Sequence, residues 1–284
     1  MTAEALPLLI LGGTGRIGRA LRRQWPEVLP GGLRPVWQAR HATPGWLGWD
    51  ILAEPCPDGA ARGVVLCLAG VISGTAEELA LNEALALAAC RAAAEQGARH
   101  VFLASSAAVY GPAPGALREK DMPAPPGPYG EAKLVMERAA LGWRQQGGLG
   151  LTILRIGNIA GLDALLGGLR PGQPVRLDPA AGQVGGPVRS YIGPVTLGRV
   201  LARLAGLAAE GAVLPPVLNV AATPAVSMAA LLDAAGVDWG FGDENPAVIP
   251  RVELDTELLQ GLVDLPSGAG QPVVMVAEWR GLKA

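Results

Sequence analysis

Short apolar runs alternate with longer helical patterns over the first half of the chain. Most of the runs are nearly continuous in Val, Leu and Ile, as is typical of strands buried on both faces of a parallel sheet. The predicted strands are residues 8–11, 36–38, 64–68, 100–104 and 151–155, and the predicted helices are residues 16–24, 76–97 and 129–146. This alternation predicts an α/β fold with a doubly wound, Rossmann-type parallel sheet.

The pattern changes after Asn158. Residues 161–190 are rich in Gly and Pro and have no long period, so we expect a loop-rich region there. Regular patterns return as a helix at 196–209, a strand at 217–220 and short helices at 227–235 and 255–263. We therefore predict a Rossmann-type domain at residues 1–157, to whose sheet residues 190–222 return, and a small C-terminal lobe at residues 158–189 and 223–284.

The composition is that of a chain that can bury a large core. Half of the 284 residues are hydrophobic, 17% are charged, and the formal net charge is −2. This charge gives no attraction to nucleic acid or to an anionic membrane surface, so neither is an expected partner. The first apolar run stops at Gly12 without a basic leader, and no stretch of about eighteen residues stays apolar. We therefore expect a cytoplasmic protein without a membrane span.

The cysteines and histidines are few and scattered. Cys56, Cys67 and Cys90 are odd in number, and Cys67 lies within an apolar strand, so we expect buried, reduced thiols. His41 and His100 are the two histidines. These five residues have no spacing that would assemble a zinc site, so no metal is expected.

The segment Gly12-Gly13-Thr14-Gly15-Arg16-Ile17-Gly18 follows the first predicted strand and opens the first predicted helix. In a chain with 40 glycines the Gly-x-x-Gly-x-x-Gly pattern carries little information by itself, and a plain strand–helix turn would look the same. Its position is informative, because glycines there permit a tight turn and the helix N-terminus offers unpaired N–H groups to a pyrophosphate. The segment therefore predicts dinucleotide binding.

Tyr129 precedes Lys133 by four residues, which places both on one face of the predicted helix. This pairing is rare by chance, because the chain contains three Tyr and three Lys. A phenol is a poor acid–base group at neutral pH, and a nearby ammonium lowers its pKa by favouring the phenolate. The alternative is a surface Tyr beside a solvated Lys.

Ser106 follows the predicted strand at 100–104, and the carboxyl ends of such strands are where sites form in doubly wound sheets. For its neighbour Ser105, a hydroxyl bonded to backbone is the simpler expectation. Ser106, Tyr129 and Lys133 are therefore the candidate catalytic residues.

These motifs resemble those of the extended short-chain dehydrogenases/reductases, the NAD-dependent epimerase/dehydratase superfamily, from residue 8 to about residue 220. The resemblance also rests on Asp50-Ile51, Leu68-Ala69-Gly70, Asn82, Ser105-Ser106-Ala107-Ala108-Val109-Tyr110-Gly111, Leu154-Arg155-Ile156-Gly157-Asn158 and Arg189-Ser190-Tyr191-Ile192. It implies an enzyme in which Ser106 holds the substrate oxygen, Tyr129 exchanges its proton, and Lys133 binds the nicotinamide ribose and lowers the pKa of Tyr129.

The resemblance implies a set of binding residues, to which the end of the second predicted strand adds Arg40. The expected cofactor-binding residues are Gly12, Gly13, Thr14, Gly15, Arg16, Ile17, Gly18, Arg40, Asp50, Ile51, Leu68, Ala69, Gly70, Asn82 and Lys133, and the expected substrate-binding residues are Ser106, Asn158 and Arg189. The family's dimers also imply a homodimer through the helices at 76–97 and 129–146.

Departures from the family pattern narrow the reaction. Ala107 and Ala108 stand where members that eliminate water usually carry an acidic pair, so a 4,6-dehydratase is not expected. Members that epimerise a carbon next to a carbonyl need an additional acid–base group, often a Cys in the same stretch, and this chain has none there. The reactions that remain are simple hydride transfers, by a reductase or a 4-epimerase. Residues 193–196, Gly-Pro-Val-Thr, replace the family's His-Val-x-Asp and put its usual nucleotide-sugar contacts in doubt.

The end of the second predicted strand indicates the cofactor. An NAD enzyme places an acidic residue there to bind the ribose 2′-hydroxyl, whereas this segment carries Arg40 and no acid. Arg16 could also reach a 2′-phosphate. The sequence therefore favours NADP over NAD, and the alternative for Arg40 is a surface charge.

The main hypothesis is an NADP-dependent oxidoreductase that reduces a carbonyl of a small or sugar-like substrate through Ser106, Tyr129 and Lys133. The alternatives are a nucleotide-sugar 4-epimerase that keeps NAD bound, and a non-catalytic NADP-binding redox sensor.

Overall fold

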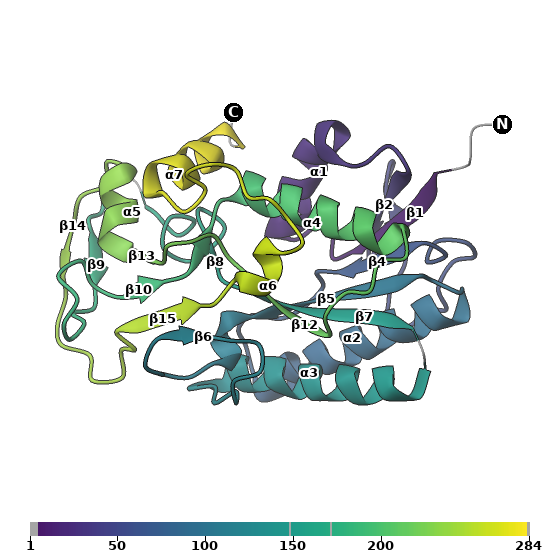
Figure 1. The fold of residues 1–284 in the computed structure, drawn as a ribbon, viewed down its shortest axis with the longest axis horizontal. Coiled ribbons are helices and arrows are strands. Elements are labelled where there is room, and N and C mark those ends of the chain that lie inside the picture. The colour runs from purple at the N-terminus through teal and green to yellow at the C-terminus, as the bar shows by residue number, and fades with distance from the viewer. Residues whose placement is uncertain (1–4, 148, 171, 283–284) are drawn as a thin grey trace.

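A seven-stranded, all-parallel sheet forms the centre of the computed structural model, which describes residues 5–147, 149–170 and 172–282 (Figure 1). Its strands are β1 (Leu6–Leu11), β2 (Leu33–Ala39), β3 (Leu47–Gly48), β4 (Val64–Cys67), β5 (His100–Ser106), β7 (Gly150–Ile156) and β12 (Val217–Val220). The order is β12-β7-β5-β4-β1-β2-β3. The strand order reverses between β1 and β4, which opens a crevice at their carboxyl ends. The predicted Rossmann-type fold class is confirmed.

Helices cover both faces of this sheet (Figure 1). α2 (Ala76–Glu95) packs against α3 (Pro128–Gly147) on one face, and α1 (Arg16–Val28) packs against α4 (Pro194–Ala209) on the other. Alternate residues of β1 enter the two cores, Leu8 and Ile10 on the α1 side and Leu9 and Leu11 on the α2 side. This two-sided burial explains why the strands are continuous apolar runs. The homodimer through α2 and α3 stays a prediction.

A smaller group of short elements lies beyond the carboxyl ends of the central strands, at the left in Figure 1. The residues 190–222 that we expect to return to the sheet supply α4 and β12, and β12 pairs with β7 as the edge strand. The division of the chain into two domains stays a prediction. The short elements are η1 (Ala107–Val109), β6 (Ala116–Leu117), β8 (Asn158–Ile159), β9 (Val175–Leu177), β10 (Val188–Arg189), β11 (Tyr191–Ile192), β13 (Val226–Ser227), α5 (Met228–Ala234), β14 (Trp239–Phe241), β15 (Arg251–Leu254), α6 (Glu257–Gln260) and α7 (Pro272–Gly281).

The C-terminal tail differs from its sequence prediction. The expected helix at 255–263 is wrong in length, because α6 ends at Gln260, one residue before Gly261. The sequence pattern also missed α7, whose carboxylate Glu278 binds the N-terminus of α4. Glu278 accepts hydrogen bonds from the backbone N–H groups of Val195 and Thr196, both at 2.9 Å, and from the Thr196 hydroxyl at 2.5 Å. The residues that replace the family's His-Val-x-Asp segment thus begin a helix that the tail caps.

The cysteines are reduced in the structure, and Cys67 and Cys90 are buried as expected, whereas Cys56 is half-buried. Burial raises the pKa of all three thiols, so they remain protonated at neutral pH. Within the described residues, no cluster of His, Cys, Asp and Glu could hold a metal ion.

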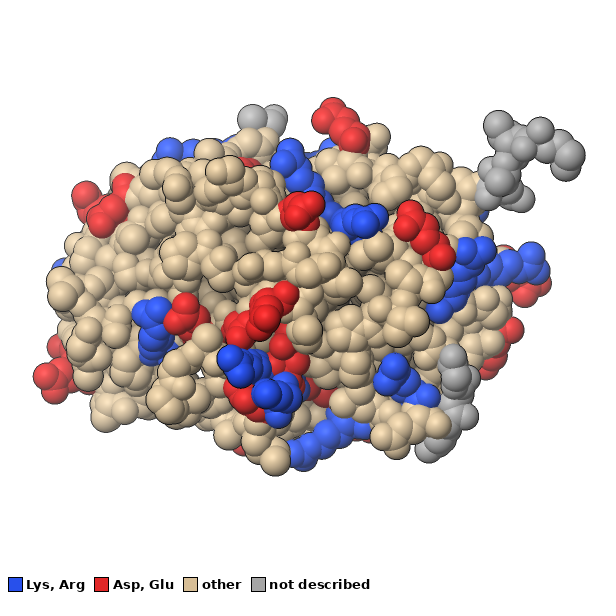
Figure 2. All heavy atoms as spheres, in the orientation of Figure 1, with Lys and Arg blue, Asp and Glu red and all other residues tan. Residues whose placement is uncertain are grey.

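On the face shown in Figure 2, basic and acidic side chains are interspersed, and a mixed cluster lies over α6 and β6. Arg118, next to β6, and Asp255, shortly before α6, form an ion pair at 3.1 Å. Among the helices of the described chain, none combines the length and hydrophobicity needed to span a membrane.

His100, at the start of β5, makes the stability of this fold pH-dependent. Its buried ring lies 3.0 Å from the Thr152 hydroxyl, and burial, assisted by the charge of Arg144, lowers its pKa to about 4. Between pH 6.5 and 4 the His100 imidazole is protonated in the unfolded chain but neutral in the folded chain. The free energy of unfolding therefore falls as the pH falls, by roughly 3 kcal/mol over that range. Urea unfolding at pH 7, 6 and 5 measures this slope. The slope should flatten in His100→Gln and persist in His41→Gln, which alters the exposed histidine; equal slopes in all three proteins would contradict the assignment.

Candidate active site

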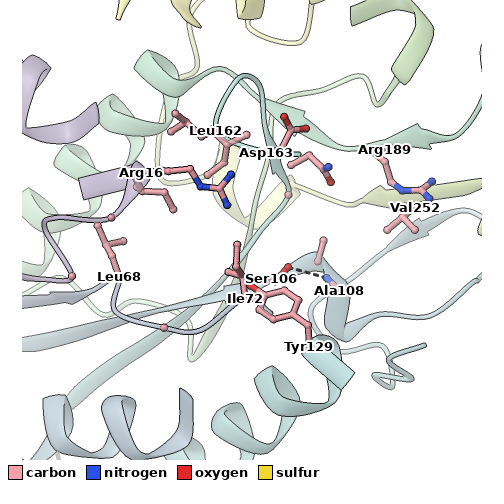
Figure 3. A pocket seen from close by; sticks show the side chains of 18 of the residues that line it. Arg16, Leu68, Ile72, Ser106, Ala108, Tyr129, Leu162, Asp163, Arg189 and Val252 are labelled. Atoms are coloured by element: carbon pink, nitrogen blue, oxygen red, sulfur yellow. Dashed lines mark hydrogen bonds between the residues drawn. The ribbon is translucent and has the colours of Figure 1, made fainter. Parts of the chain in front are cut away.

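A cavity of about 680 Å³ opens at the carboxyl ends of the central strands (Figure 3). It gathers residues from segments that lie far apart in the sequence. Those that the sequence analysis singled out and that line the cavity are Gly12, Gly15, Arg16, Ile17, Gly18, Leu68, Gly70, Ser106, Tyr129, Asn158 and Arg189. These expected residues are brought together in one cavity. The other expected cofactor-binding residues, Gly13, Thr14, Arg40, Asp50, Ile51, Ala69, Asn82 and Lys133, are not among the described residues that line it.

The turn from β1 into α1 exposes backbone groups, rather than side chains, to a ligand in the cavity. Gly12 has φ +76°, and a Cβ added to it would lie 2.6 Å from the backbone nitrogen of Ala69, so only glycine fits. Gly15 is the N-cap of α1, and no side chain caps that end within the described structure. The unsatisfied N–H groups of the first helical turn are thus available to a phosphate. These features fit the pyrophosphate of a dinucleotide.

Ser106 and Tyr129 lie next to each other at one edge of the cavity (Figure 3). Ser106 ends β5, and its hydroxyl oxygen accepts a hydrogen bond from the Ala108 backbone at 3.1 Å. Burial raises the pKa of Tyr129, while hydrogen bonding to Ser106 and the charge of Arg16 act in the opposite direction. Tyr129 is therefore a protonated phenol at neutral pH and can donate that proton to a substrate oxygen.

Lys133 lies one helical turn behind Tyr129, under the floor of the cavity. Its side chain is 4% exposed, and its ammonium donates to the Ala104 carbonyl at 2.9 Å. A Cβ added to Gly70 would lie 3.1 Å from its Nζ. Burial lowers the pKa of Lys133 to about 8, and electrostatic interactions with Cys67 and Glu137 act in the opposite direction.

The expectation that Lys133 lowers the pKa of Tyr129 is wrong for this structure. The ammonium is directed to Ala104, and the net effect on the Tyr129 phenol is an upward shift dominated by burial. The cation that lowers the pKa of Tyr129 is Arg16, which points into the cavity from α1 (Figure 3).

Asn82 shapes the loop after β4 through bonds to the backbone. Its side chain is 1% exposed; its oxygen accepts from Val71 N–H at 3.2 Å, and its amide donates to the carbonyls of Val71 and Leu79, both at 2.9 Å. The direct cofactor contact expected of Asn82 stays a prediction; in this structure its polar groups fix the loop that carries Leu68 and Gly70.

Arg40, Asp50 and Ile51 do not line the cavity. The Arg40 guanidinium is 76% exposed, and its Nε lies 3.9 Å from a carboxylate oxygen of Asp50. The sequence favours NADP because no acid follows the second strand, and in the structure β2 indeed ends at Ala39 and is followed by Arg40 and His41. The sequence did not reveal that the short pairing of β3 with β2 brings Asp50 beside Arg40.

Several residues of the site escaped the sequence analysis. A Cβ on Gly130 would collide with the carbonyl oxygen of Ala108, so glycine permits the first turn of α3 to approach the Ser106 segment. Asp163 is the single acidic residue among the described residues that line the cavity, and burial raises its pKa. Gly130 stands inside the Tyr–Lys motif and could have been noticed, whereas a lone Asp in a loop gives no signal.

A second cavity has a volume of about 480 Å³ and shares one lining residue with the first. Arg189 lines both cavities, and Arg170 and Arg176 line the second. Burial lowers the pKa of Arg189 from its ordinary value, and the group remains a cation at neutral pH.

The fold and the site together define an α/β enzyme of the nicotinamide-dinucleotide-binding class. The sequence model of the NAD-dependent epimerase/dehydratase family matches residues 8–165, and the chain belongs to this family. No curated protein matches the sequence.

Solved structures with the same fold include several with bound nucleotide sugars. MoeE5, in complex with UDP-glucuronic acid and NAD, is 22% identical with a TM-score of 0.77 over 98% of this chain and 100% of that chain. UDP-glucuronic acid 4-epimerase from Bacillus cereus, with UDP-glucuronic acid and NAD, is 16% identical with a TM-score of 0.75 over 98% and 99%. UDP-glucose 4-epimerase from Thermus thermophilus, with NAD, is 20% identical with a TM-score of 0.70 over 97% and 99%. At these identities the similarity establishes the fold.

Proposed function

We propose that the protein is a nucleotide-sugar 4-epimerase that keeps NAD bound through its cycle. The observation that carries this proposal is the placement of Ser106 and Tyr129 in one cavity with the glycine turn of β1–α1. The proposal replaces the NADP-dependent carbonyl reductase favoured by the sequence. Its further support is the family membership and the NAD-bound nucleotide-sugar epimerases that share the fold.

NAD is the proposed cofactor because of the charge next to Arg40. The carboxylate of Asp50 lies 3.9 Å from the guanidinium and would both compete for it and repel a 2′-phosphate. The glycine turn would hold the pyrophosphate, and Lys133 would bind the nicotinamide ribose. A bound NAD would supply reversible hydride transfer at a substrate carbon.

The protein's own residues would transfer the substrate hydroxyl proton that is lost and regained together with the hydride. Ser106 and Tyr129 would hold the substrate hydroxyl between them, with Tyr129 taking its proton on oxidation and returning it on reduction. Arg16 favours the phenolate form that oxidation requires, since it lowers the pKa of Tyr129. Ala107 and Ala108 line the cavity and provide no acid–base group for eliminating water, so the chemistry stops at redox exchange.

The second cavity would hold the nucleoside diphosphate. Arg189 lines both cavities, and Arg170 and Arg176 add positive charge to the second. Guanidinium groups bind phosphate oxygens with paired hydrogen bonds, so this arrangement suits a diphosphate. The sugar would then lie in the first cavity beside Tyr129.

The cofactor part of the proposal is tested by titration with NADH and NADPH, with energy transfer from the seven Trp to the bound dihydronicotinamide as the signal. We expect NADH to bind roughly tenfold or more tightly than NADPH, because of Asp50. Asp50→Asn should narrow this preference, while Asp58→Asn, an exposed control in the following loop, should leave it unchanged. Tighter binding of NADPH by the unaltered protein would contradict the proposal.

A further inference from the structure

Three polar residues repeat at four-residue intervals along one face of α3. They are Tyr129, Lys133 and Glu137. Glu137 is 1% exposed, one turn beyond Lys133, and the cavity does not reach it. A carboxylate with so little exposure is costly to bury unless its charge is matched, so its place behind the candidate catalytic residues needs an explanation.

The positively charged partner of Glu137 is Arg155 on β7. Arg155 Nη2 lies 2.7 Å from one carboxylate oxygen of Glu137, and its Nε lies 3.1 and 3.2 Å from the two oxygens. The Ser105 hydroxyl, adjacent to Ser106 on β5, donates to the same carboxylate at 2.5 Å. Glu137 thus connects α3 to β5, which carries Ser106, and to the neighbouring strand β7.

The network continues from Arg155 toward the smaller lobe. Its Nη1 donates to the Tyr110 hydroxyl at 2.8 Å, and that hydroxyl lies 3.0 Å from the side-chain oxygen of Asn219. Asn219, fully buried at the edge strand β12, donates to the carbonyls of Leu117 and Asp255. A shift of α3 would therefore disturb an unbroken set of buried hydrogen bonds, which stiffens the helix that carries Tyr129.

We propose that Glu137 is a positioning residue of the active site, which fixes the Tyr129–Lys133 face of α3 against β5 and β7 and supplies negative charge to the Lys133 ammonium. This inference rests on the proposed function, since it assigns Glu137 a task in that site. The electrostatic part follows from the groups around Lys133. Cys67 on β4 and Glu137 on α3 both act to raise the pKa of Lys133, but the Cys67 thiol is protonated at neutral pH, so the charge that favours the ammonium is that of Glu137. The hydrogen bonds of the ammonium go to uncharged groups, the Ala104 carbonyl and Met136 Sδ.

The Glu137–Arg155 ion pair could act only on stability or could also supply charge to Lys133, and these two roles predict different effects of substitutions. Removing either partner weakens packing in both cases and lowers stability. Only the charge-supplying role moves the Lys133 titration in opposite directions. Glu137→Gln leaves the cation of Arg155 uncompensated and should lower the pKa of Lys133, whereas Arg155→Met leaves the anion of Glu137 and should raise it.

The experiment is a pH titration of the folded protein labelled with ¹³Cε-lysine, followed by NMR. The chain has three lysines, Lys120, Lys133 and Lys283, so the spectrum has three signals, and the one lost in Lys133→Arg identifies Lys133. We expect the Lys133 midpoint near pH 8 in the unaltered protein, about one pH unit lower in Glu137→Gln and higher in Arg155→Met. Glu137→Asp, which keeps the charge, should restore a midpoint close to that of the unaltered protein.

The matched control is Glu131→Gln, the same substitution at an exposed position of α3, which should leave the midpoint unchanged. The inference is overturned if the Lys133 midpoint stays unchanged in either Glu137→Gln or Arg155→Met when that variant folds. It is also overturned if both variants shift the midpoint in the same direction. The titration needs no substrate, so its failure is separable from that of the proposed function. A shifted Lys133 in a protein that turns over no nucleotide sugar would overturn the function alone.

Discussion

Tyr129→Phe should lower the turnover number by about a thousandfold and leave the affinity for NAD within about twofold of the unaltered protein. The substitution keeps the half-buried ring in place and removes the hydroxyl that faces Ser106 in the cavity. Positioned proton transfer contributes about 10²–10⁴-fold to such reactions. Tyr110 also lines the cavity, but its hydroxyl is bonded to Asn219 and to the Arg118 carbonyl and so cannot replace the lost phenol. Steady-state kinetics with a nucleotide-sugar substrate measure the first quantity, and cofactor titration measures the second.

Tyr191→Phe is the matched control for this loss. The Tyr191 side chain is fully buried, and it is not among the described residues that line either cavity. Its hydroxyl interacts with the cavity residues Asp163 and Asn158 but is not itself exposed to the cavity, so its removal should lower turnover by far less than Tyr129→Phe does. Near-normal turnover of Tyr129→Phe would show that Tyr129 does not handle the proton.

Gly130→Ala should lower turnover by about a hundredfold, although the altered side chain touches no substrate. Its Cβ would collide with the carbonyl oxygen of Ala108, which forces the first turn of α3 away from the Ser106 segment. A displacement of about 1 Å in a catalytic group costs on the order of 10²-fold in rate, and the overpacked contact costs about 1–3 kcal/mol in stability. Kinetics and thermal unfolding measure both effects.

Gly142→Ala provides the comparison on the same helix. A Cβ at Gly142 meets no atom within 4 Å, so the substitution should keep full turnover and raise stability by about 0.5–1 kcal/mol. Equal turnover in Gly130→Ala and Gly142→Ala would mean that the close approach of α3 to Ala108 does not position Tyr129.

The central sheet could be predicted from sequence because its strands are buried on both faces. Leu8, Leu9, Ile10 and Leu11 are all fully buried, and such a run reads as a strand without any knowledge of its neighbours. Ser106 and Tyr129 could be placed together for a related reason. Parallel strands deliver their carboxyl ends to one edge, and the helix after β5 begins at that edge.

Features that depend on distant pairings could not be predicted. The approach of Asp50 to Arg40 arises from a two-residue strand, β3, which has no periodicity to detect. The direction of the Lys133 ammonium depends on burial and on the Ala104 carbonyl, neither of which is visible in a four-residue spacing. Helix α7 is short, and its anchor Glu278 binds a segment 82 residues earlier in the chain.

The central claim is that a retained NAD oxidises and re-reduces the same sugar carbon. It is tested most directly by incubating the purified protein, without added nucleotide or reductant, with UDP-glucose, UDP-glucuronic acid and UDP-N-acetylglucosamine, each deuterated at C4. NMR of the products then follows the configuration and the label at C4. The account predicts formation of the C4 epimer of at least one of these sugars, with deuterium kept at C4 and no net change in NAD. Absence of any epimer, together with NADPH-dependent reduction of a carbonyl substrate, would contradict it.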